Sequence, residues 1–493
     1  MSLPILSCIL WAPVLGMVLI LFLPSRERVA KAAALLGSGI PLALCAYLVF
    51  HFQPDQGYQF VENVLWIKEL GISYFLGLDG LNLGLLLLVS LLSFLVVLAM
   101  PQQKERPAAF YFCLLVVEFG LVGVFLSLDL ILFYIFWEVV LVPGYFLISI
   151  WGGPNRRKAS LKFLMYTLLG SLILLIAILA IYAKANLHTF SIPALLSARL
   201  SPEFQHLIFF FLLIGLAIKV PLFPFHSWQP DAYVEAPDSV TVLLSGLMAK
   251  MGVYGFIRVG YSLVPQGSAQ LSWLVCILAV ITIIYANLCA AVQKDLKRMF
   301  AYSSLGHMGL IMLGVGVLNP LGLEGSIFHM FNHGIIAGSI FMVISLIQDT
   351  LGTIEIRKLR LIVHYIPTGA MLLWLFILAS FGLPGMSSFI AELYILSGAF
   401  QAKVIFGIIA MIGTIIMAGY IFSMLPKISF RGTQVSGPNQ TETLQVVADY
   451  NKKLIFSLIS LSIIIILLGC YPKLLLLTSQ NYVAQFIARM QLP

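Results

Sequence analysis

Apolar runs long enough to cross a bilayer follow one another along almost the whole chain, and this feature restricts its fold most strongly. Residues 83–99 read LGLLLLVSLLSFLVVLA. About 20 such residues form a helix that spans the hydrocarbon core, where a helix satisfies its own backbone groups. With 61% hydrophobic and 10% charged residues, the chain has too little polar surface for a soluble protein. The pattern predicts an all-α polytopic membrane protein.

Fourteen spans are expected from the hydropathy of the 493 residues. Their predicted ranges are 2–23, 29–51, 79–100, 109–126, 130–150, 161–183, 205–230, 238–262, 271–291, 299–317, 323–347, 369–400, 403–424 and 453–474. The N-terminal run lacks a basic segment and a small-residue cleavage site, so we interpret it as a first span and not a cleaved signal.

Lysine and arginine set the expected orientation, because cytoplasmic loops are enriched in them. With fourteen spans, the basic clusters fall on one side: Arg26, Arg28 and Lys31; Lys104 and Arg106; Arg156, Arg157, Lys158 and Lys162; Lys294, Lys297 and Arg298; Arg357, Lys358 and Arg360; Lys427, Arg431, Lys452 and Lys453. Both termini are then non-cytoplasmic. This asymmetry explains the net charge of +8 better than nucleic-acid binding does.

Redox and nucleotide motifs are missing from the sequence. The six cysteines lie in apolar runs without CxxC spacing, so they are expected to be core residues. There is no P-loop, no GxGxxG after a strand and no iron–sulfur cysteine run. We therefore expect no metal and no cofactor in this chain, and its energy must come from an ion gradient or from a partner.

Two spans are interrupted. The seventh contains VPLFP directly after Lys219, and the twelfth contains FGLPGM at residues 381–386. Interrupted spans in the two halves of a transporter indicate inverted repeats around a midplane site. The expected division is 1–106 for the first three spans, 107–262 and 263–425 for two antiporter-like repeats, and 426–493 for a cytoplasmic loop and the final span.

Ionisable residues inside the spans are the candidate functional residues, because a charge in the bilayer is costly and needs a partner or water. In chain order they are Glu138, Lys219, Lys250, His307, His329, His333 and Glu392. Carboxylates, lysines whose protonation depends on burial, and histidines can pass protons along a chain. The helix breaks supply backbone groups that can hold water. The pattern predicts a proton-transfer path.

Each residue also has a structural interpretation. Glu138 and Lys219 could form a static ion pair, and His329 could serve packing. His329 and His333 share a helix face, yet two histidines without a third ligand are weak evidence for a metal site. Asp79, Glu118 and Asp129 would be interfacial charges, Arg258 would extend its charged end to the surface, and His226 would bond freed backbone groups at the break.

Five motifs resemble the antiporter-like membrane subunits of respiratory complex I, most closely the subunit M branch, the bacterial counterpart of mitochondrial subunit 4. They are FWEVVLVPGYFLISIWGG, KVPLFPFHSWQPDAYVEAP, LLSGLMAKMGVYGFIR, QKDLKRMFAYSSLGHMG and FGLPGMSSFIAELYILSGAF. The resemblance covers nearly the whole chain. It implies a fold of fourteen spans with two inverted five-helix repeats, located in the proton-pumping arm of the complex.

The resemblance assigns proton translocation to six matching positions, which are Glu138, Lys219, Lys250, His307, His333 and Glu392. It implies a non-redox subunit of a proton-translocating NADH:quinone oxidoreductase in a bacterial inner membrane. Its partners would be other membrane subunits, including neighbouring antiporter-like ones. NADH, flavin, iron–sulfur clusters and quinone would bind partner subunits, and no nucleic acid is expected.

One departure and several rival functions stay open. After VEAP the family usually has a small or hydroxyl residue, whereas this chain has Asp238, which could take up protons or be merely solvated. The alternatives are a subunit of a multi-subunit Mrp-type cation/proton antiporter, a subunit of a membrane-bound hydrogenase or of a non-NADH dehydrogenase, and a structural anchor without an ion path.

Overall fold

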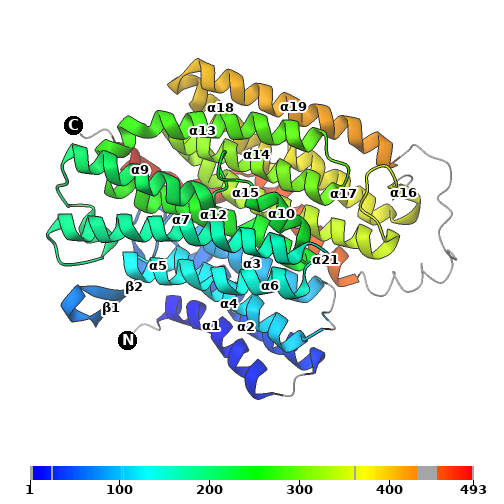
Figure 1. Cartoon of the computed structure of the whole chain (residues 1–493), viewed down its shortest axis with the longest axis horizontal. Helices are drawn as coiled ribbons and strands as arrows, with labels where there is room; N and C mark the ends of the chain where they lie inside the picture. Colours follow the sequence, from blue (N-terminus) through cyan, green and yellow to red (C-terminus); the bar gives the residue numbers. More distant parts are fainter. Residues whose placement is uncertain are drawn as a thin grey trace.

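Long helices running mostly along the longest axis of the molecule make up the structure (Figure 1). The computed structural model describes residues 4–23, 26–100, 103, 105–359, 362–429 and 452–490. The predicted cytoplasmic residues Lys104, Arg360 and Arg431 lie outside this part of the chain. So does most of the predicted loop after residue 426.

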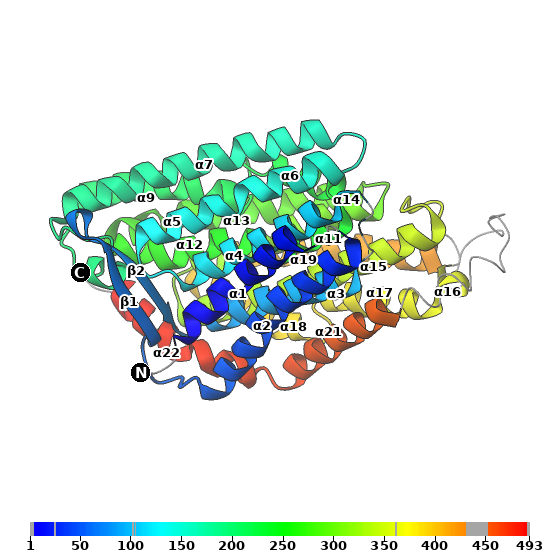
Figure 2. The same ribbon diagram turned by 90° about the horizontal axis from the view of Figure 1, so that it is seen from below.

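The N-terminal region combines helices with a short hairpin. Its elements are α1 (Ile5–Phe22), α2 (Glu27–His51), β1 (Gln59–Ile67), η1 (Lys68–Leu70), β2 (Ile72–Leu78) and α3 (Leu83–Ala99). The strands β1 and β2 pair antiparallel. Figure 2 shows this hairpin at one end of the bundle, beside the beginning of α1 and near α22 (Lys473–Met490).

The middle of the chain contains the first interrupted span. Its elements are α4 (Pro107–Leu126), α5 (Leu130–Val139), α6 (Leu141–Trp151), α7 (Arg156–Ala185), α8 (Ile192–Leu195), α9 (Pro202–Lys219), α10 (Trp228–Glu235), α11 (Asp238–Leu243), η2 (Leu244–Met248), α12 (Ala249–Gly255) and η3 (Phe256–Tyr261). Both η2 and η3 are π-helical turns, so the helix of the span at 238–261 is locally wider at these two turns than an ordinary α-helix.

The remaining helices contain the second interruption. They are α13 (Pro265–Ala291), α14 (Leu296–Gly316), α15 (Pro320–Leu351), α16 (Ile362–Tyr365), α17 (Pro367–Ser380), α18 (Ser387–Ala402), α19 (Val404–Ser429), α21 (Lys452–Cys470) and α22. Within the described residues, twelve helical segments are long and apolar enough to cross a membrane, and α3 and α17 are shorter apolar helices. Every one of the fourteen predicted ranges therefore contains helix. The chain is a multi-pass membrane protein.

Local sequence accounts for where several helices begin. The Asp129 carboxylate accepts hydrogen bonds from the first amides of α5, Asp295 caps α14 and Asn319 caps α15. Such caps satisfy amide groups that have no partner within the helix. Proline occupies the first turn of α4, α9 and α13, where its missing N–H is not needed.

The two interruptions lie where the proline and glycine residues predicted them. Helix α9 ends at Lys219, and the chain resumes helix at Trp228 after Pro221 and Pro224. Between α17 and α18, Gly382 and Gly385 have φ values of 78° and 91°, a left-handed conformation that glycine adopts at little cost. A side chain stabilises the first break, because the Trp228 indole N–H donates a hydrogen bond to the Ile218 carbonyl at 2.9 Å.

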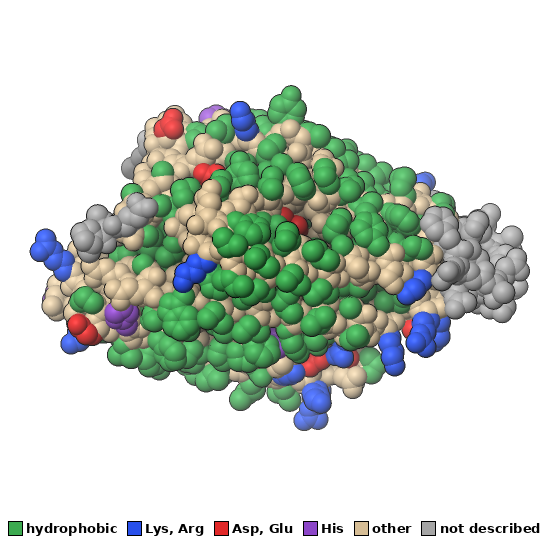
Figure 3. Space-filling model, turned by 90° about the horizontal axis from the view of Figure 1, so that it is seen from above, with side chains coloured by type: hydrophobic (Ala, Val, Ile, Leu, Met, Phe, Trp, Pro, Cys, Tyr) green, Lys and Arg blue, Asp and Glu red, His purple; other side chains and the backbone are tan. Residues whose placement is uncertain are grey.

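The surface matches a bilayer environment. Hydrophobic side chains cover much of the middle of the face shown in Figure 3, and Lys and Arg lie mostly toward its ends. Lipid provides no hydrophobic drive between helices, so close packing must hold them together. At the contact between η2 and α15, a Cβ on Gly246 would lie 3.2 Å from the Gly334 carbonyl oxygen. A Cβ on Gly334 would lie 2.8 Å from the Gly246 carbonyl oxygen, which a side chain does not tolerate. The two glycines therefore let the span of Lys250 pack against the span of His333.

The prediction that the cysteines are core residues holds for some of them and not for others. All six are unpaired, and Cys45 and Cys276 are buried. Cys8 and Cys470 are exposed, so the expectation that every cysteine is a core residue was wrong for these two. Both lie on apolar helices whose outer faces carry other exposed apolar residues, such as Trp11 and Leu467. A small thiol on such a face needs no polar partner.

Candidate functional site

Lys250 has two partners deep inside the bundle. Its Nζ donates to the Ser245 carbonyl at 2.6 Å and lies 2.7 Å from Nδ1 of His333. The Ser245 carbonyl belongs to the π-helical turn η2, one turn before Lys250 in the same span. The sequence suggested no partner for Lys250, because His333 is 83 residues away. A lysine and a histidine in this contact can share or exchange one proton.

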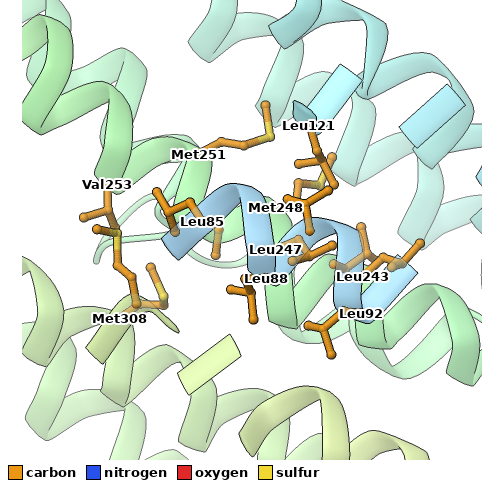
Figure 4. Packing of buried hydrophobic residues seen from close by; sticks show 14 of the residues in the cluster. Leu85, Leu88, Leu92, Leu121, Leu243, Leu247, Met248, Met251, Val253 and Met308 are labelled. Carbon is orange, nitrogen blue, oxygen red and sulfur yellow. The ribbon is translucent and has the colours of Figure 1, made fainter. Parts of the chain in front are cut away.

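Apolar side chains pack around the span that carries Lys250. Figure 4 shows Leu85, Leu88 and Leu92 of α3 packed among Leu247 and Met251 of the Lys250 span. Lys250 itself is fully buried. A charge in such a place is stabilised chiefly by the few polar groups that touch it, so its protonation is sensitive to them.

Three histidines from two helices form a cluster beyond Lys250. Helix α14 contributes His307, and α15 contributes His329 and His333. The ring centroids of His307 and His333 are 5.3 Å apart. His307 Nδ1 lies 3.3 Å from His329 Nε2. His329 therefore contacts the chain of titratable groups from the side, whereas His307 and His333 continue it.

Glu392 continues the cluster on the other side of His307. Its Oε1 lies 3.9 Å from His307 Nδ1, and both side chains are buried. Glu392 comes from α18, just after the second helix break. A Cβ on Gly382 in that break would lie 2.7 Å from Glu392 Oε2. The break thus leaves the space that this carboxylate occupies. Lys250, His333, His307 and Glu392 form one continuous series.

A small cavity of about 10 Å³ borders the series. It is lined by His307, His333, Ser303, Ser304 and Ser380, together with apolar residues. Nε2 of both histidines and Oγ of Ser303 and Ser304 are buried without a hydrogen-bond partner. A water needs about this volume and two to four polar partners. The site therefore suits one water molecule between the two imidazoles.

Lys219 and Glu138 lie near each other without a direct ion pair among the described contacts. Lys219 is 2% exposed, and its Nζ lies 5.4 Å from the centre of the Trp137 ring. Glu138 follows Trp137 on α5 and is close enough to act electrostatically on Lys219. Its Oε1 is buried without a hydrogen-bond partner. The static ion pair considered from the sequence is therefore not the arrangement present.

The span of Lys250 also touches the end of the Lys219 helix. A Cβ on Gly252 would lie 2.8 Å from the Val220 amide nitrogen and 3.2 Å from the Lys219 carbonyl carbon. This contact places the first helix break directly against α12. No hydrogen bond joins the two lysines among the described residues. Any proton transfer between them would need water or movement.

The histidine cluster offers a third possible metal ligand that sequence spacing did not reveal. Ligand atoms of His307, His329 and Glu392 all lie within 4.8 Å of one another. The short nitrogen–nitrogen contact is also that of an ordinary histidine–histidine hydrogen bond, which requires no ion. We therefore assign no metal to this group.

A buried ion pair lies at the other end of the same span, where sequence reasoning was wrong. Arg258 was expected to reach the surface and Asp79 to be interfacial, yet both are buried. Two 2.7 Å hydrogen bonds join the guanidinium to the two Asp79 oxygens. Rings of Tyr58, Tyr254 and Tyr482 surround it within 5.6 Å. Burial raises the pKa of the Tyr58 hydroxyl, which therefore stays neutral beside the pair.

Three further polar residues differ from their sequence interpretations. Glu118 is buried within α4, and its Oε1 has no hydrogen-bond partner, so it is not interfacial. Asp129 is fully buried and caps α5. His226 follows the first break and stacks near Phe223 and Tyr285, while its Nδ1 has no partner. The expected hydrogen bond between the His226 ring and freed backbone groups is not found among the described contacts.

Known proteins match this chain over nearly its full length. A family described as NADH:quinone oxidoreductase/Mrp antiporter, TM, matches residues 127–417. NADH-quinone oxidoreductase subunit M of Rickettsia prowazekii is 34% identical, with 99% of this chain and 100% of that protein covered. F(420)H(2) dehydrogenase subunit M of Methanosarcina mazei is 35% identical, with 96% and 95% covered.

Solved structures agree with the fold. A chain of respiratory complex I from Thermus thermophilus superposes with a TM-score of 0.85 at 28% identity, covering 99% of both chains. The matched region contains both helix breaks and all six predicted site residues. The chain therefore belongs to the NADH:quinone oxidoreductase/Mrp antiporter transmembrane family.

Proposed function

We propose that this chain is a proton-translocating membrane subunit of a complex I-type NADH:quinone oxidoreductase. The observation that carries the proposal is the continuous buried series Lys250–His333–His307–Glu392, with contacts of 2.7 Å at one end and 3.9 Å at the other. A scaffold without an ion path has no use for so many buried titratable groups, which are costly in a membrane.

The relay uses the chemistry of each side chain. A proton on Lys250 passes to Nδ1 of His333, and the free Nε2 of His333 faces the water-sized cavity that His307 also lines. Histidine can accept a proton on one ring nitrogen and release it from the other. His307 then hands a proton to Glu392. Each transfer forms one N–H or O–H bond and breaks another.

In this proposal, Glu138 and Lys219 regulate the proton relay. A carboxylate near Lys219 favours the charged ammonium, and its withdrawal or neutralisation favours the neutral amine. Because Lys219 stands at the helix break against α12, a change in its charge acts on Lys250 through a low-dielectric interior. Glu138 thereby couples events in a neighbouring subunit to this relay.

Sidedness and partners follow from the same proposal. Basic loops face the cytoplasm of a bacterial inner membrane, and both termini face the opposite side. Residues 107–262 and 263–425 form inverted repeats, and the fourth span of each contains its break. This chain is a non-redox subunit, so NADH, flavin, iron–sulfur clusters and quinone bind elsewhere in the complex. Neighbouring antiporter-like subunits and lipid are its direct surroundings, and no nucleic acid takes part.

The closest rivals share this fold and differ in their electron donor or partners. A subunit M of an F(420)H(2) dehydrogenase is about as similar as the NADH-quinone oxidoreductase subunit. An Mrp-type antiporter lies in the same family description. The resemblance of the motif that contains Glu392, FGLPGMSSFIAELYILSGAF, is to the subunit M branch. Purification of the complex and assay with NADH separates these candidates.

Replacing Lys219 by alanine tests the relay. In the assembled complex in proteoliposomes, we expect proton pumping coupled to quinone reduction to fall at least several-fold, because the charge switch beside Lys250 is lost. Dye quenching and NADH oxidation are measured together. Lys358, which is exposed and bridges Glu355 at 2.6 Å, provides the matched control Lys358→Ala, which should pump normally. Normal pumping by an assembled Lys219→Ala complex would contradict the proposal.

A further inference from the structure

A cavity of about 290 Å³ opens at the end of the bundle that carries the basic loops. Its wall comes from the turn after α6, from the turn between α10 and α11, and from α14 and α15. The polar lining residues are Glu235, Asp238, Lys297 and Gln348. This volume holds several water molecules. The cavity is separate from the small one beside His307, whose lining shares none of these residues.

Asp238 and Lys297 form an ion pair in the wall of this cavity. Lys297 Nζ lies 2.8 Å from Asp238 Oδ1 and donates to the Ala236 carbonyl at 2.6 Å. The Lys297 side chain is 8% exposed and that of Asp238 is 20% exposed. The ammonium is thus held in place by the backbone, whereas the carboxylate reaches water.

Other charged groups face the pair from each neighbouring element. Glu235 at the end of α10 lines the same cavity, and Asp349 on α15 is close enough to interact electrostatically with Asp238. Arg156 at the start of α7 donates to the carbonyl of Gly152, another lining residue. Three carboxylates and two cations therefore set the local potential, with Asp238 in direct contact with one cation.

Buried hydroxyl groups lead from this cavity toward Lys250. Thr241 Oγ1, one turn after Asp238, donates to the Tyr233 carbonyl at 2.9 Å. The Tyr233 hydroxyl donates to the Leu244 carbonyl at 3.0 Å. The next residue, Ser245, supplies the carbonyl that Lys250 contacts. All of these side chains are buried.

Two polar atoms along this route lack partners. Gln229 Oε1 and Ser245 Oγ are buried without a hydrogen-bond partner. Buried polar groups in such positions are usually satisfied by internal water. The π-helical turn η2 lies at the same level, and π-turns often mark functional sites. The unpaired Ser245 hydroxyl therefore favours internal water near the start of η2, on the route between Asp238 and Lys250.

We propose that Asp238 is a proton-collecting carboxylate that loads Lys250 from the cytoplasmic cavity, with Lys297 holding it in position. This inference rests on the proposed function and adds an uptake residue to it. A proton from cavity water forms an O–H bond at Asp238. The neutral carboxyl releases the Lys297 ammonium, which keeps its bond to the Ala236 carbonyl. The carboxyl then gives the proton to water on the inner side and is ionised again.

The role of Asp238 is to accelerate uptake and not to form the relay. The family usually places a small or hydroxyl residue here, so transfer inside the membrane does not require a carboxylate. A collecting group matters most when protons are scarce. Removal of Asp238 should therefore slow pumping at alkaline pH and leave it almost unchanged at neutral pH.

The test uses the whole complex in proteoliposomes, with Asp238→Ser, Asp238→Glu and the control Glu355→Gln. Glu355 is also a bridged carboxylate at the basic end, but it does not line the cavity. Proton uptake and NADH oxidation are measured at neutral and alkaline pH, with and without imidazole. We expect a several-fold loss of pumping for Asp238→Ser at alkaline pH only. Asp238→Glu and Glu355→Gln should resemble the unmodified complex.

Imidazole separates proton collection from a structural role. It is a small mobile buffer that can enter the cavity and deliver protons, so it should restore Asp238→Ser at alkaline pH. Equal pumping by Asp238→Ser and the unmodified complex at alkaline pH would overturn the inference. A loss at every pH that imidazole does not restore would overturn it as well, because the residue would then be structural.

Lys250→Ala distinguishes failure of this inference from failure of the proposed function. If Lys250→Ala abolishes pumping while Asp238→Ser pumps normally, only the uptake role is wrong. If assembled Lys250→Ala still pumps normally, the relay itself is wrong, and no uptake residue can load it.

Discussion

Buried ionisable side chains occur here in two settings, and the difference between them is visible in their partners. Arg258 donates hydrogen bonds to Asp79 and to the hydroxyls of Tyr254 and Tyr58, and three tyrosine rings lie around it. Glu138, Glu392 and the relay histidines each retain an atom without a partner. A saturated pair is a fixed structural element, whereas an unsatisfied titratable group can gain or lose a proton at lower cost.

Asp79→Asn tests whether the buried Asp79–Arg258 pair has a structural role. The change leaves the buried Arg258 charge without a counter-charge, which costs about 3–5 kcal/mol for a buried pair. We expect a lower yield of assembled complex and a lower thermal unfolding midpoint. Asp55→Asn, at an exposed position near β1, is the control. The double variant Asp79→Asn with Arg258→Gln should recover part of the loss, and an unchanged midpoint in the single variant would contradict this role.

Residue types were predictable from the sequence, but their pairing was not. An ionisable group within an apolar run is conspicuous, which is why all six candidate residues could be named from the sequence. Lys250 and His333 meet because two glycines, Gly246 and Gly334, let their helices approach closely. Arg258 was misjudged because its position near a span end allowed it to reach water. Its partner Asp79 lies 179 residues away.

Helix breaks position charged groups at the level of elements. Lys219 terminates α9, and Glu392 follows the break before α18. Both breaks were predictable, since proline lacks a donor and glycine permits left-handed backbone. The hairpin β1–β2 and the helix α22 were not. The hairpin stands outside the apolar runs, and α22 mixes apolar and polar residues along one helix, so neither gives a membrane-span signal.

Gly252→Ala tests the contact between α12 and the first break. Its Cβ would meet the Val220 backbone at 2.8 Å, and overpacking of this kind costs about 1–3 kcal/mol. We expect Lys219 to shift relative to Lys250 and pumping to fall with little loss of assembly. Gly419 is a helical glycine with open space around its Cβ position. Gly419→Ala should therefore pump normally, and equal behaviour of the two variants would show that the contact is unimportant.

The whole molecule has two chemically different ends. Ion pairs at one end connect loops far apart in sequence, because Asp231 binds both Lys162 and Arg298. The hairpin, the short helix α8 and the Asp79–Arg258 pair lie at the other end. A cavity of about 80 Å³ there is lined by the ion pair, by Ile192 of α8 and by Tyr58, which precedes the hairpin. The sequence predicted this polarity from the basic loops alone, since charge asymmetry needs no knowledge of packing.

Single cysteines test the proposed orientation at this scale. In a background with Cys8 and Cys470 replaced by serine, an impermeant maleimide should label Gly57→Cys from the non-cytoplasmic side. It should label Lys358→Cys from the cytoplasmic side. Both positions are exposed. Intact spheroplasts and inverted vesicles supply the two sides, and labelling of both cysteines from one side would refute the assignment.

Tyr482 of α22 covers Arg258, and Asn481 beside it donates to the Asp55 carbonyl. The ribosome makes these residues after both Asp79 and Arg258. Until they are synthesised, the Asp79–Arg258 pair lacks the cover of Tyr482, even when the earlier spans have inserted. A chain stopped before residue 473 would therefore leave this ion pair more open to water than the full chain does.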